Sequence, residues 1–432
     1  MKLIKMLKKS RSSNNPIIKS ILILSGGTAS AQIINIIFTP IITRLYSPED
    51  MGTLTLFMSI LVMFSIMGSL KYELGIPLAN NDKKAINIVA LCISILVVFV
   101  GLITIFISFF GDTLLGLFSA TALIKYQYFI PFGILFTGLY AILTQWAFRK
   151  KNYIKLSKTK FTQSIGQNFI KILMGIFSFG PIGLILGNII GQSAGISLLA
   201  STFKGKDKHL IKKINKKTMY WCAKRYINFP KYTATSHLLN SAGLQLPVFI
   251  TSYLYGSSVT GYYGLAAAMV NIPMQLIGLS IADVFYAEAA SFGRNNPQKL
   301  KLLVNKILVK TILIGLLPFI ILLLFGPFLF SFIFGDIWYE AGVYARIIAL
   351  LVFARLVFTP ISRVFTVYER QKEELALDVI RILLVIGVYV ISKHFLLSSY
   401  LFILLYTIGM TLLYLLTYLW ARNIINQEII RK

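Results

Sequence analysis

The residues of this chain that could do chemistry are charged side chains within long apolar stretches. Lys171, Arg346 and Arg355 lie inside such stretches and have no obvious acidic partner nearby in the sequence. Charge in hydrocarbon is costly, so charged residues at such depth usually face a cavity or a partner. Arginine suits phosphate because its planar guanidinium binds two oxygens at once. The pattern favours a cationic cavity for an anionic substrate, and a snorkelling lysine or an ion pair with a distant acid is the alternative.

A second group of charges lies nearer the predicted cytoplasmic ends of the apolar stretches. Lys71 is two residues from Glu73, and Asp378 is three residues before Arg381, so each pair can neutralise itself. Asp283 is the third main acid within an apolar stretch.

Uncharged polar residues form stripes along four of the apolar stretches. Successive members are mostly three or four residues apart, which places each set on one face of a helix. The stripes are Ser25, Thr28, Gln32, Asn35 and Thr39; Lys160, Gln163, Gln167 and Lys171; Thr233, His237 and Asn240; and Asn271 and Gln275. Hydrogen bonding between helices would explain any single amide. Four stripes spread over both halves of the chain favour a hydrated central cavity.

The composition tells which elements must position these residues. Of the 432 residues, 56% are hydrophobic and only 13% are charged, about half the usual share of charge in a soluble protein. A transmembrane barrel would alternate polar and apolar residues in short strands, and no such pattern is present. We therefore predict an all-α integral membrane protein with twelve transmembrane helices, each about 20 residues or longer. The predicted spans are 17–45, 51–72, 85–110, 126–148, 156–178, 181–203, 229–254, 260–286, 302–328, 339–362, 374–394 and 397–421.

Basic residues predict the orientation of these spans. With the N-terminus inside, 36 of the 43 Lys and Arg residues fall on the cytoplasmic side, and only Arg44, Lys125 and Lys393 fall outside. Cytoplasmic loops are enriched in Lys and Arg, so both termini are predicted to be cytoplasmic. The net charge of +28 then mostly reflects the basic residues of the cytoplasmic loops and does not indicate nucleic-acid binding.

A basic connection divides the chain into an N-terminal lobe (1–203, helices 1–6), a linker (204–228) and a C-terminal lobe (229–432, helices 7–12). Apolar residues such as Leu210, Ile214 and Trp221 alternate with lysines along this linker. The pattern is typical of an amphipathic helix on anionic lipid. A positive-inside loop without a further role fits it equally well.

A weak internal repeat supports two lobes. Residues 41–52 (IITRLYSPEDMG) resemble residues 249–261 (FITSYLYGSSVTG), and each segment has a proline just upstream, Pro40 or Pro247. In both segments a glycine follows a tyrosine by six residues (Tyr46 to Gly52, Tyr255 to Gly261). Two six-helix lobes related by a pseudo-two-fold axis around a central cavity are an arrangement of transporters.

No motif for catalysis or energy coupling is present. The chain has no G-x-x-x-x-G-K-[ST] phosphate loop, and its three histidines and two cysteines form no metal or catalytic spacing. We predict a transporter and no enzyme, with no metal and no cofactor.

With these features, the chain resembles the Wzx-type oligosaccharide flippases, which belong to the superfamily of the MATE multidrug exporters and the lipid II flippase. The resemblance covers nearly the whole length. It depends on the six-plus-six arrangement, on the segment from Phe38 to Gly52 (FTPIITRLYSPEDMG), and on Tyr72-Glu73 followed by Gly75-Ile76-Pro77-Leu78.

The resemblance implies a flippase that moves undecaprenyl-pyrophosphate-linked glycan from the cytoplasmic to the external face of the bacterial inner membrane. It implies alternating access without ATP hydrolysis, in the synthesis of surface polysaccharide such as the O-antigen of lipopolysaccharide. A lipid-linked oligosaccharide and anionic membrane lipids are the expected partners, with a polysaccharide polymerase and other assembly proteins as further candidates.

Each candidate site residue then has an expected role. Lys171, Arg346, Arg355 and Lys71 would attract the pyrophosphate. Gln32, Gln167, Asn240, Asn271 and Gln275 would contact sugar hydroxyls. Glu73, Asp283 and Asp378 are candidates for ion coupling.

Three alternatives stay open at this point. A multidrug exporter of the same superfamily would be expected to carry acids in its cavity, and this chain has few within its spans. A glycan polymerase or ligase would need a large polar external loop, and the longest predicted one has about 15 residues near Gly111 to Lys125. The third alternative is a lipid-binding scaffold that transports nothing.

Overall fold

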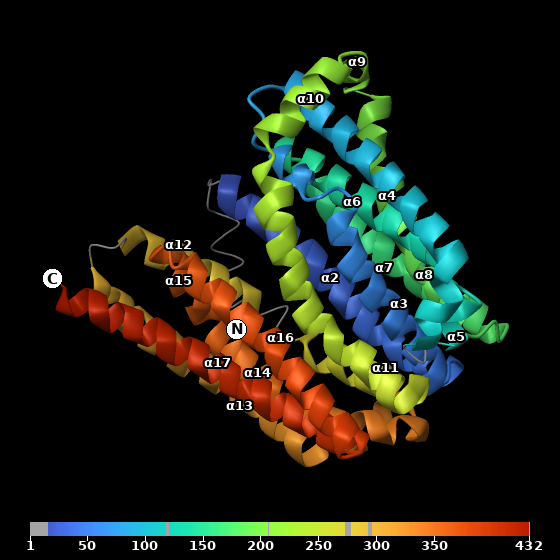
Figure 1. Cartoon of the computed structure of the whole chain (residues 1–432), viewed down its shortest axis with the longest axis vertical. Coiled ribbons are helices and arrows are strands. Elements are labelled where there is room, and N and C mark those ends of the chain that lie inside the picture. The colour runs from blue at the N-terminus through green and yellow to red at the C-terminus, as the bar shows by residue number, and fades with distance from the viewer. Residues whose placement is uncertain (1–15, 118–120, 206, 273–277, 293–295, 432) are drawn as a thin grey trace. The chain divides into compact units, whose positions relative to one another are not determined.

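The chain folds into helices, as Figure 1 shows. The computed structural model describes residues 16–117, 121–205, 207–272, 278–292 and 296–431, and no strand occurs among them. The predicted all-α fold is confirmed. The long helices are α2 (Pro16–Leu45), α3 (Pro48–Met67), α4 (Asp82–Leu117), α6 (Phe129–Arg149), α7 (Tyr153–Ile176), α8 (Pro181–Lys204), α11 (Thr235–Val270), α12 (Leu279–Phe292), α13 (Pro297–Phe334), α14 (Tyr339–Phe358), α16 (Gln371–His394) and α17 (Ser399–Ile430).

The predicted number of twelve membrane spans is not confirmed. Among the described residues, eight helices are long and apolar enough to cross a membrane. The helices α2, α7 and α11 are long but are not among the eight, and each carries one of the predicted polar stripes. The helix α12 has only 14 residues. The prediction took each sufficiently long apolar stretch as a span. A polar stripe lowers the mean hydropathy of a helix that faces other helices, and length alone does not take this into account.

Local sequence explains where these helices begin. At the start of α3, the backbone N–H of Ser47 donates to Asp50 Oδ2 at 3.0 Å, and the N–H of Asp50 donates to Ser47 Oγ at 3.2 Å. This reciprocal pair is a capping box, with Pro48 at the first helical position, where proline is favoured. The phrase Ser-Pro-Glu-Asp is therefore the start signal of α3. The asparagines Asn152 and Asn215 cap α7 and α10 (Lys216–Arg225) in a similar way.

Contacts divide the chain into two compact units. Unit 1 contains residues 1–46, 60–114 and 123–238, and unit 2 contains residues 47–59, 115–122 and 239–432. In unit 1, α7 packs against α2 and α8. In unit 2, α14 packs against α13 and α17, and α16 packs against α17. The division of the chain at a linker of residues 204–228 stays a prediction.

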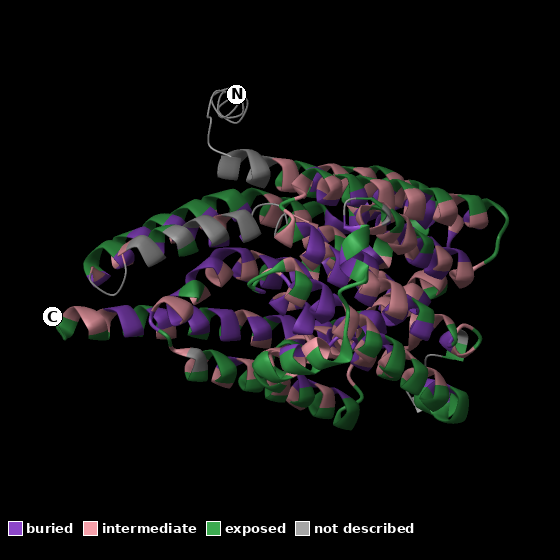
Figure 2. Cartoon of the chain, turned by 90° about the horizontal axis from the view of Figure 1, so that it is seen from above, coloured by how far each residue is buried: buried purple, intermediate pink, exposed green. Residues whose placement is uncertain are grey.

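Many large apolar side chains point away from the helix packing. Exposed positions follow the lengths of several helices in Figure 2. On α13, Leu313, Leu317, Leu324, Phe328 and Phe332 are all at least 60% exposed. Such surfaces would aggregate in water, so they agree with helices that are surrounded by lipid.

The two segments of the predicted repeat make matching contacts. The Tyr46 hydroxyl donates to the Lys171 carbonyl at 2.6 Å, and the Tyr255 hydroxyl donates to the Leu397 carbonyl at 3.0 Å. The hydroxyls of Thr43 and Thr251 donate to the carbonyls of Pro40 and Pro247, at 3.1 and 2.7 Å. These equivalent contacts support the repeat that the sequence predicts.

The glycines of the repeat lie against each other in unit 2. A β-carbon added to Gly52 would overlap the carbonyl oxygen of Ser257, and one added to Gly261 would overlap the carbonyl oxygen of Pro48. Pro48 and Ser257 each follow their repeat tyrosine by two residues. The two helices can approach this closely only because both positions lack a side chain. Between them, Gly256 adopts a φ of +83°, which suits glycine, and this kink separates the two predicted spans that α11 joins.

The basic linker contains two short helices, α9 (Lys208–Ile211) and α10, where one amphipathic helix was predicted. One face of α10 is held to unit 1: Cys222 is buried, and the Tyr72 hydroxyl donates to the Ala223 carbonyl at 3.1 Å. On the other face Tyr220 and Trp221 are exposed, and the ring of Trp221 receives the Lys84 ammonium at 4.1 Å.

Two ion pairs tie the start of the linker to α4 and α6. The Lys150 ammonium lies 2.7 Å from an oxygen of Asp82 and 3.1 Å from an oxygen of Asp207. Burial alone would lower the pKa of Lys150, but its bonds to the two carboxylates outweigh this and raise it. Asp207 also accepts from the Trp146 indole at 3.0 Å. The single acid of the linker is therefore already paired, and its exposed surface is left basic.

Candidate functional site

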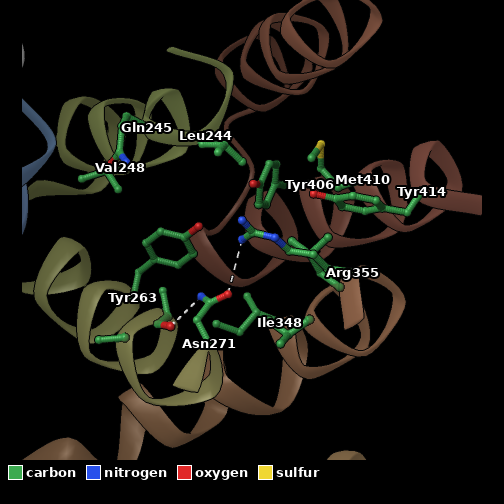
Figure 3. A pocket seen from close by; sticks show the side chains of 14 residues that line it. Leu244, Gln245, Val248, Tyr263, Asn271, Ile348, Arg355, Tyr406, Met410 and Tyr414 are labelled. Atoms are coloured by element: carbon green, nitrogen blue, oxygen red, sulfur yellow. Dashed lines mark hydrogen bonds between the residues drawn. The ribbon is translucent and has the colours of Figure 1, made fainter. Parts of the chain in front are cut away.

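Arg355 of α14 lines a cavity of about 370 Å³ within unit 2 (Figure 3). The helices α11, α14 and α17 enclose it, together with Asn271, which follows the last residue of α11. Most of the lining is apolar or aromatic, and Arg355 is its only charged residue among those the structure describes. A cavity of this size lies within the usual range of small-molecule sites, about 300–1,000 Å³.

The guanidinium of Arg355 is oriented by an amide. Its Nη1 donates to Asn271 Oδ1 at 3.4 Å, and Asn271 Nδ2 donates to the Ala267 carbonyl at 2.6 Å. Figure 3 shows the Arg355 side chain pointing toward Tyr263, Tyr406 and Asn271. Arg355 makes no ion pair with an acid whose side chain the structure describes. Its charge is thus available to an anion in the cavity.

A second cavity of about 220 Å³ is also lined by Arg355, and it shares Leu244 and Tyr414 with the first. The other charged residues of its described lining lie on α16: Glu374, Asp378 and Arg381. Asp378 accepts from Arg381 Nη1 at 2.6 Å and from Asn240 Nδ2 of α11 at 3.3 Å. The predicted Asp378–Arg381 pair is confirmed, and the structure brings Asn240, Asn271, Asp378 and Arg355 into two adjoining cavities.

The structure separates Arg346 from Arg355. Nine residues correspond to about two and a half turns, so the two arginines lie on opposite faces of α14. Arg346 is exposed, and its Nη2 donates to the Leu324 carbonyl of α13 at 3.4 Å. It lines neither of the two cavities. Its surroundings are those of a snorkelling arginine on an outer helix face.

The remaining predicted cations lie in unit 1. The Lys171 side chain packs over Gly187 of α8, and its ammonium makes no ion pair with the described residues. Lys71 lies 3.6 Å from Glu73, as the sequence predicts. Glu73 is buried and accepts from the Ser69 hydroxyl at 2.6 Å.

The amides of unit 1 bond to one another. The side-chain oxygen of Asn35 on α2 accepts from Ser164, Gln167 and Asn168 of α7, at 2.8, 2.9 and 2.8 Å. Gln163 donates to Gln192 of α8 at 3.0 Å. These bonds join helices, which is the role expected of any single amide in a span. Gln32 lies on α2 and has an interaction of its own.

Two predicted residues cannot be placed. Gln275 lies outside the described residues. Asp283 lies in α12, but its side chain is outside the described part of the structure.

Several cavity residues were not predicted from the sequence. Tyr406 and Tyr414 lie eight residues apart on α17 and line the larger cavity with Tyr263. The four-residue spacing of Tyr406, Met410 and Tyr414 was the available signal, since it places all three on one helix face. Glu374 belongs to a charged stripe with Asp378 and Arg381, which could have indicated that α16 faces a polar space.

Comparison with solved structures defines the class of this fold. A multidrug resistance MATE family transporter of the MOP superfamily, in an inward-facing conformation, matches with a TM-score of 0.75 and 14% identity over 92% of this chain and 95% of that one. The lipid II flippase MurJ, in an inward closed conformation, matches with a TM-score of 0.75 and 15% identity over 93% of this chain and 87% of that one. A MOP superfamily transporter from Pyrococcus furiosus matches with a TM-score of 0.59 and 15% identity, over 95% and 96%. The chain is a multi-pass membrane protein with the fold of the MOP transporters.

Sequence comparison identifies the family. Residues 41–343 match the family described as "Polysaccharide biosynthesis protein", and the chain belongs to this family. No curated protein sequence matches the chain. The resemblance predicted from the sequence is confirmed at the level of family and fold.

Proposed function

We propose that this protein is a flippase for an undecaprenyl-pyrophosphate-linked oligosaccharide. It would move the glycan from the cytoplasmic to the external face of the bacterial inner membrane by alternating access, for a surface polysaccharide such as O-antigen. The observation that carries the proposal is Arg355, a cation that has no acidic partner among the described side chains and lines a cavity of about 370 Å³. The polysaccharide biosynthesis family and the fold shared with a lipid II flippase support it.

The chemistry of the cavity favours an anion over an organic cation. No acid is among the described residues that line the larger cavity, whereas a site for organic cations would be expected to carry one. The guanidinium can bind phosphate oxygens, and the phenol and amide groups of Tyr263, Tyr406 and Asn271 can bond to sugar hydroxyls. This arrangement argues against the multidrug exporter.

Deletion of the gene tests the function. We expect surface glycan to be lost and complete lipid-linked repeat units to accumulate on the cytoplasmic leaflet, with recovery when the wild-type gene is restored. Extraction of the lipid-linked glycan, with and without access of a glycan-modifying reagent to the outer leaflet, measures this. Single repeat units on the cell surface would indicate a polymerase instead, and normal glycan with raised sensitivity to organic cations would indicate a multidrug exporter.

We also propose that both termini and the basic linker are cytoplasmic, as the distribution of Lys and Arg predicts. In intact cells, a cysteine replacing Ser398 should react with an impermeant thiol reagent, and cysteines replacing Asn81 or Lys217 should react only after permeabilisation. The native Cys92 and Cys222 are both buried and give a low background. Labelling of the Lys217 variant in intact cells would contradict the orientation.

The exposed face of α10 is proposed to contact anionic lipid. Lys216, Lys217 and Lys224 are exposed there beside Tyr220 and Trp221, a combination that suits a charged membrane surface. The same Lys217→Cys variant tests the contact in liposomes. Its thiol should react more slowly in vesicles with anionic lipid than in zwitterionic vesicles, and equal rates would leave the linker as a loop without a lipid partner.

A further inference from the structure

The helix α14 exposes one narrow stripe of its surface. Most of its residues are buried or half-buried, and the exposed ones are Tyr339, Arg346 and Leu350. With 3.6 residues per turn, these three positions lie within roughly 40° of one another around the helix. Arg346 is the charged member of the stripe, so α14 presents a single guanidinium on its outer face.

The surface beside this stripe belongs to α13 and is apolar. The two helices touch closely one turn before Arg346, where a β-carbon added to Gly342 would lie 2.6 Å from the Gly326 carbonyl oxygen. This close approach lets the Arg346 side chain reach across to α13, where its Nη2 donates to the Leu324 carbonyl at 3.4 Å. The side chains of Leu324 and Phe328 are exposed there. The guanidinium therefore lies on a surface that is otherwise made for hydrocarbon.

No acid neutralises this guanidinium among the residues whose side chains are described. The acids at the start of α14 are engaged elsewhere: Glu340 accepts from the Tyr400 hydroxyl, and Asp336 accepts from the Ser331 hydroxyl. The bond to the Leu324 carbonyl uses one of the five N–H donors of the guanidinium. An unpaired charge against hydrocarbon is costly, so a negatively charged group from outside the chain would be strongly favoured here.

The position of Arg346 along α14 brings it within reach of lipid phosphates. Tyr339 is the first residue of α14 and is exposed, and exposed tyrosines are typical of the boundary between membrane and water. Arg346 follows seven residues later, which corresponds to about 10 Å along the helix. Side chains of a helix lean toward its N-terminus, so the guanidinium lies nearer to this boundary than its own Cα atom does.

We propose that Arg346 binds the phosphate of an anionic phospholipid of the surrounding bilayer, on the surface shared by α13 and α14. The planar guanidinium can donate to two phosphate oxygens at once, and the acyl chains would lie along Leu324 and Phe328. A lipid with one net negative charge, such as phosphatidylglycerol, neutralises the site. A zwitterionic lipid would add a cation beside the arginine.

This lipid site is distinct from the cavity of the proposed transport site. Arg346 and Arg355 lie on opposite faces of α14, and Arg346 lines neither cavity. The inference therefore does not depend on which substrate the protein moves. Only the leaflet depends on the proposed orientation, in which α14 begins at the external face and the lipid belongs to the external leaflet.

The test is native mass spectrometry of the full-length protein in detergent, titrated separately with phosphatidylglycerol and with phosphatidylcholine. The spectra resolve each bound lipid, so they give the affinity of each binding step. We expect the first phosphatidylglycerol to bind wild type about tenfold more tightly than the first phosphatidylcholine. A difference of this size is typical of a hydrogen bond to a charged group.

Three variants locate the site. In Arg346→Gln the tenfold preference for phosphatidylglycerol should disappear, and because the residue is exposed the variant should unfold at the wild-type temperature in detergent without added lipid. Arg346→Lys keeps a charge on a long stem and should keep a weaker preference. Lys393→Gln is the matched control: Lys393 is also an exposed cation, its ammonium already donates to the Tyr253 hydroxyl at 3.4 Å, and its removal should leave the preference unchanged.

Three results would overturn the inference. The first is equal affinity of wild type for the two lipids, or an unchanged preference in Arg346→Gln. The second is an equal loss in Lys393→Gln, which would show a general attraction of lipid to positive charge. The third is displacement of the first phosphatidylglycerol by a glycosyl diphosphate ester of geraniol, which would assign Arg346 to the transported substrate instead.

Discussion

Replacement of Arg355 by glutamate is expected to abolish glycan export while the amount of protein in the membrane stays normal. Arg355 is the only charged residue that lines the larger cavity within the described part of the chain, so its reversal turns an anion-attracting site into an anion-repelling one. Removing one partner of a buried charged contact costs about 2–5 kcal/mol, and each ~1.4 kcal/mol is a factor of ten. We expect an export rate at least ~100-fold lower, measured as surface glycan per unit of membrane protein.

Two further variants make this prediction specific. Arg355→Lys keeps the charge but not the planar fork, and it should lose about tenfold. Arg346→Gln is the matched control, because Arg346 lies on the opposite, exposed face of the same helix. It should export nearly as well as wild type. If Arg355→Glu exports normally, or if Arg346→Gln fails as severely, Arg355 does not define the site.

Replacement of Gly52 or Gly261 by alanine is expected to prevent stable folding. The added β-carbon would overlap a backbone carbonyl oxygen in each case, and it would lie 3.1 or 2.9 Å from the backbone nitrogen of the opposite glycine. Backbone cannot move aside as a flexible side chain can. The loss of stability should reach the upper end of the ~1–3 kcal/mol typical of overpacking, or exceed it. Thermal unfolding of the detergent-solubilised protein measures it.

Gly101 provides the control for this prediction. It lies in α4 with nothing within 4 Å of an added β-carbon. Gly101→Ala should be neutral or stabilising by up to ~1 kcal/mol, because alanine favours a helix more than glycine does. An unfolding temperature of Gly52→Ala equal to that of Gly101→Ala would show that the two helices do not meet at these glycines.

Features that depend on a local pattern of residues could be predicted from the sequence. Apolar length and low charge predict helices in lipid, because backbone groups in hydrocarbon must be bonded within their own segment. The capping box at Ser47 follows from residues adjacent in the chain. The internal repeat could also be predicted from the sequence. Its two glycines, Gly52 and Gly261, lie where two helices meet, and both positions must lack a side chain there. The predicted number of twelve spans is not confirmed, because length alone does not tell a lipid-facing helix from one with a polar face.

Which of the predicted residues share a site depends on how the helices pack in three dimensions. Helical periodicity shows that Arg346 and Arg355 point in opposite directions, but only the tertiary arrangement, in which α11, α14 and α17 line one cavity, tells which of them faces it. Asn35 and Gln167 bond to each other across two helices, and no periodicity distinguishes such a bond from a free amide.

The set of charged residues described in the lining of the smaller cavity is likewise a product of packing. Asp378 and Arg381 are near each other in the sequence, and their pairing was predictable from the three-residue spacing. Arg355 is 19 residues before Glu374 on a different helix, and it joins them only because α14 and α16 line one space. Electrostatic attraction depends on distance in space, so the net charge of a site is set by which helix faces meet, and no single segment of the chain contains that information.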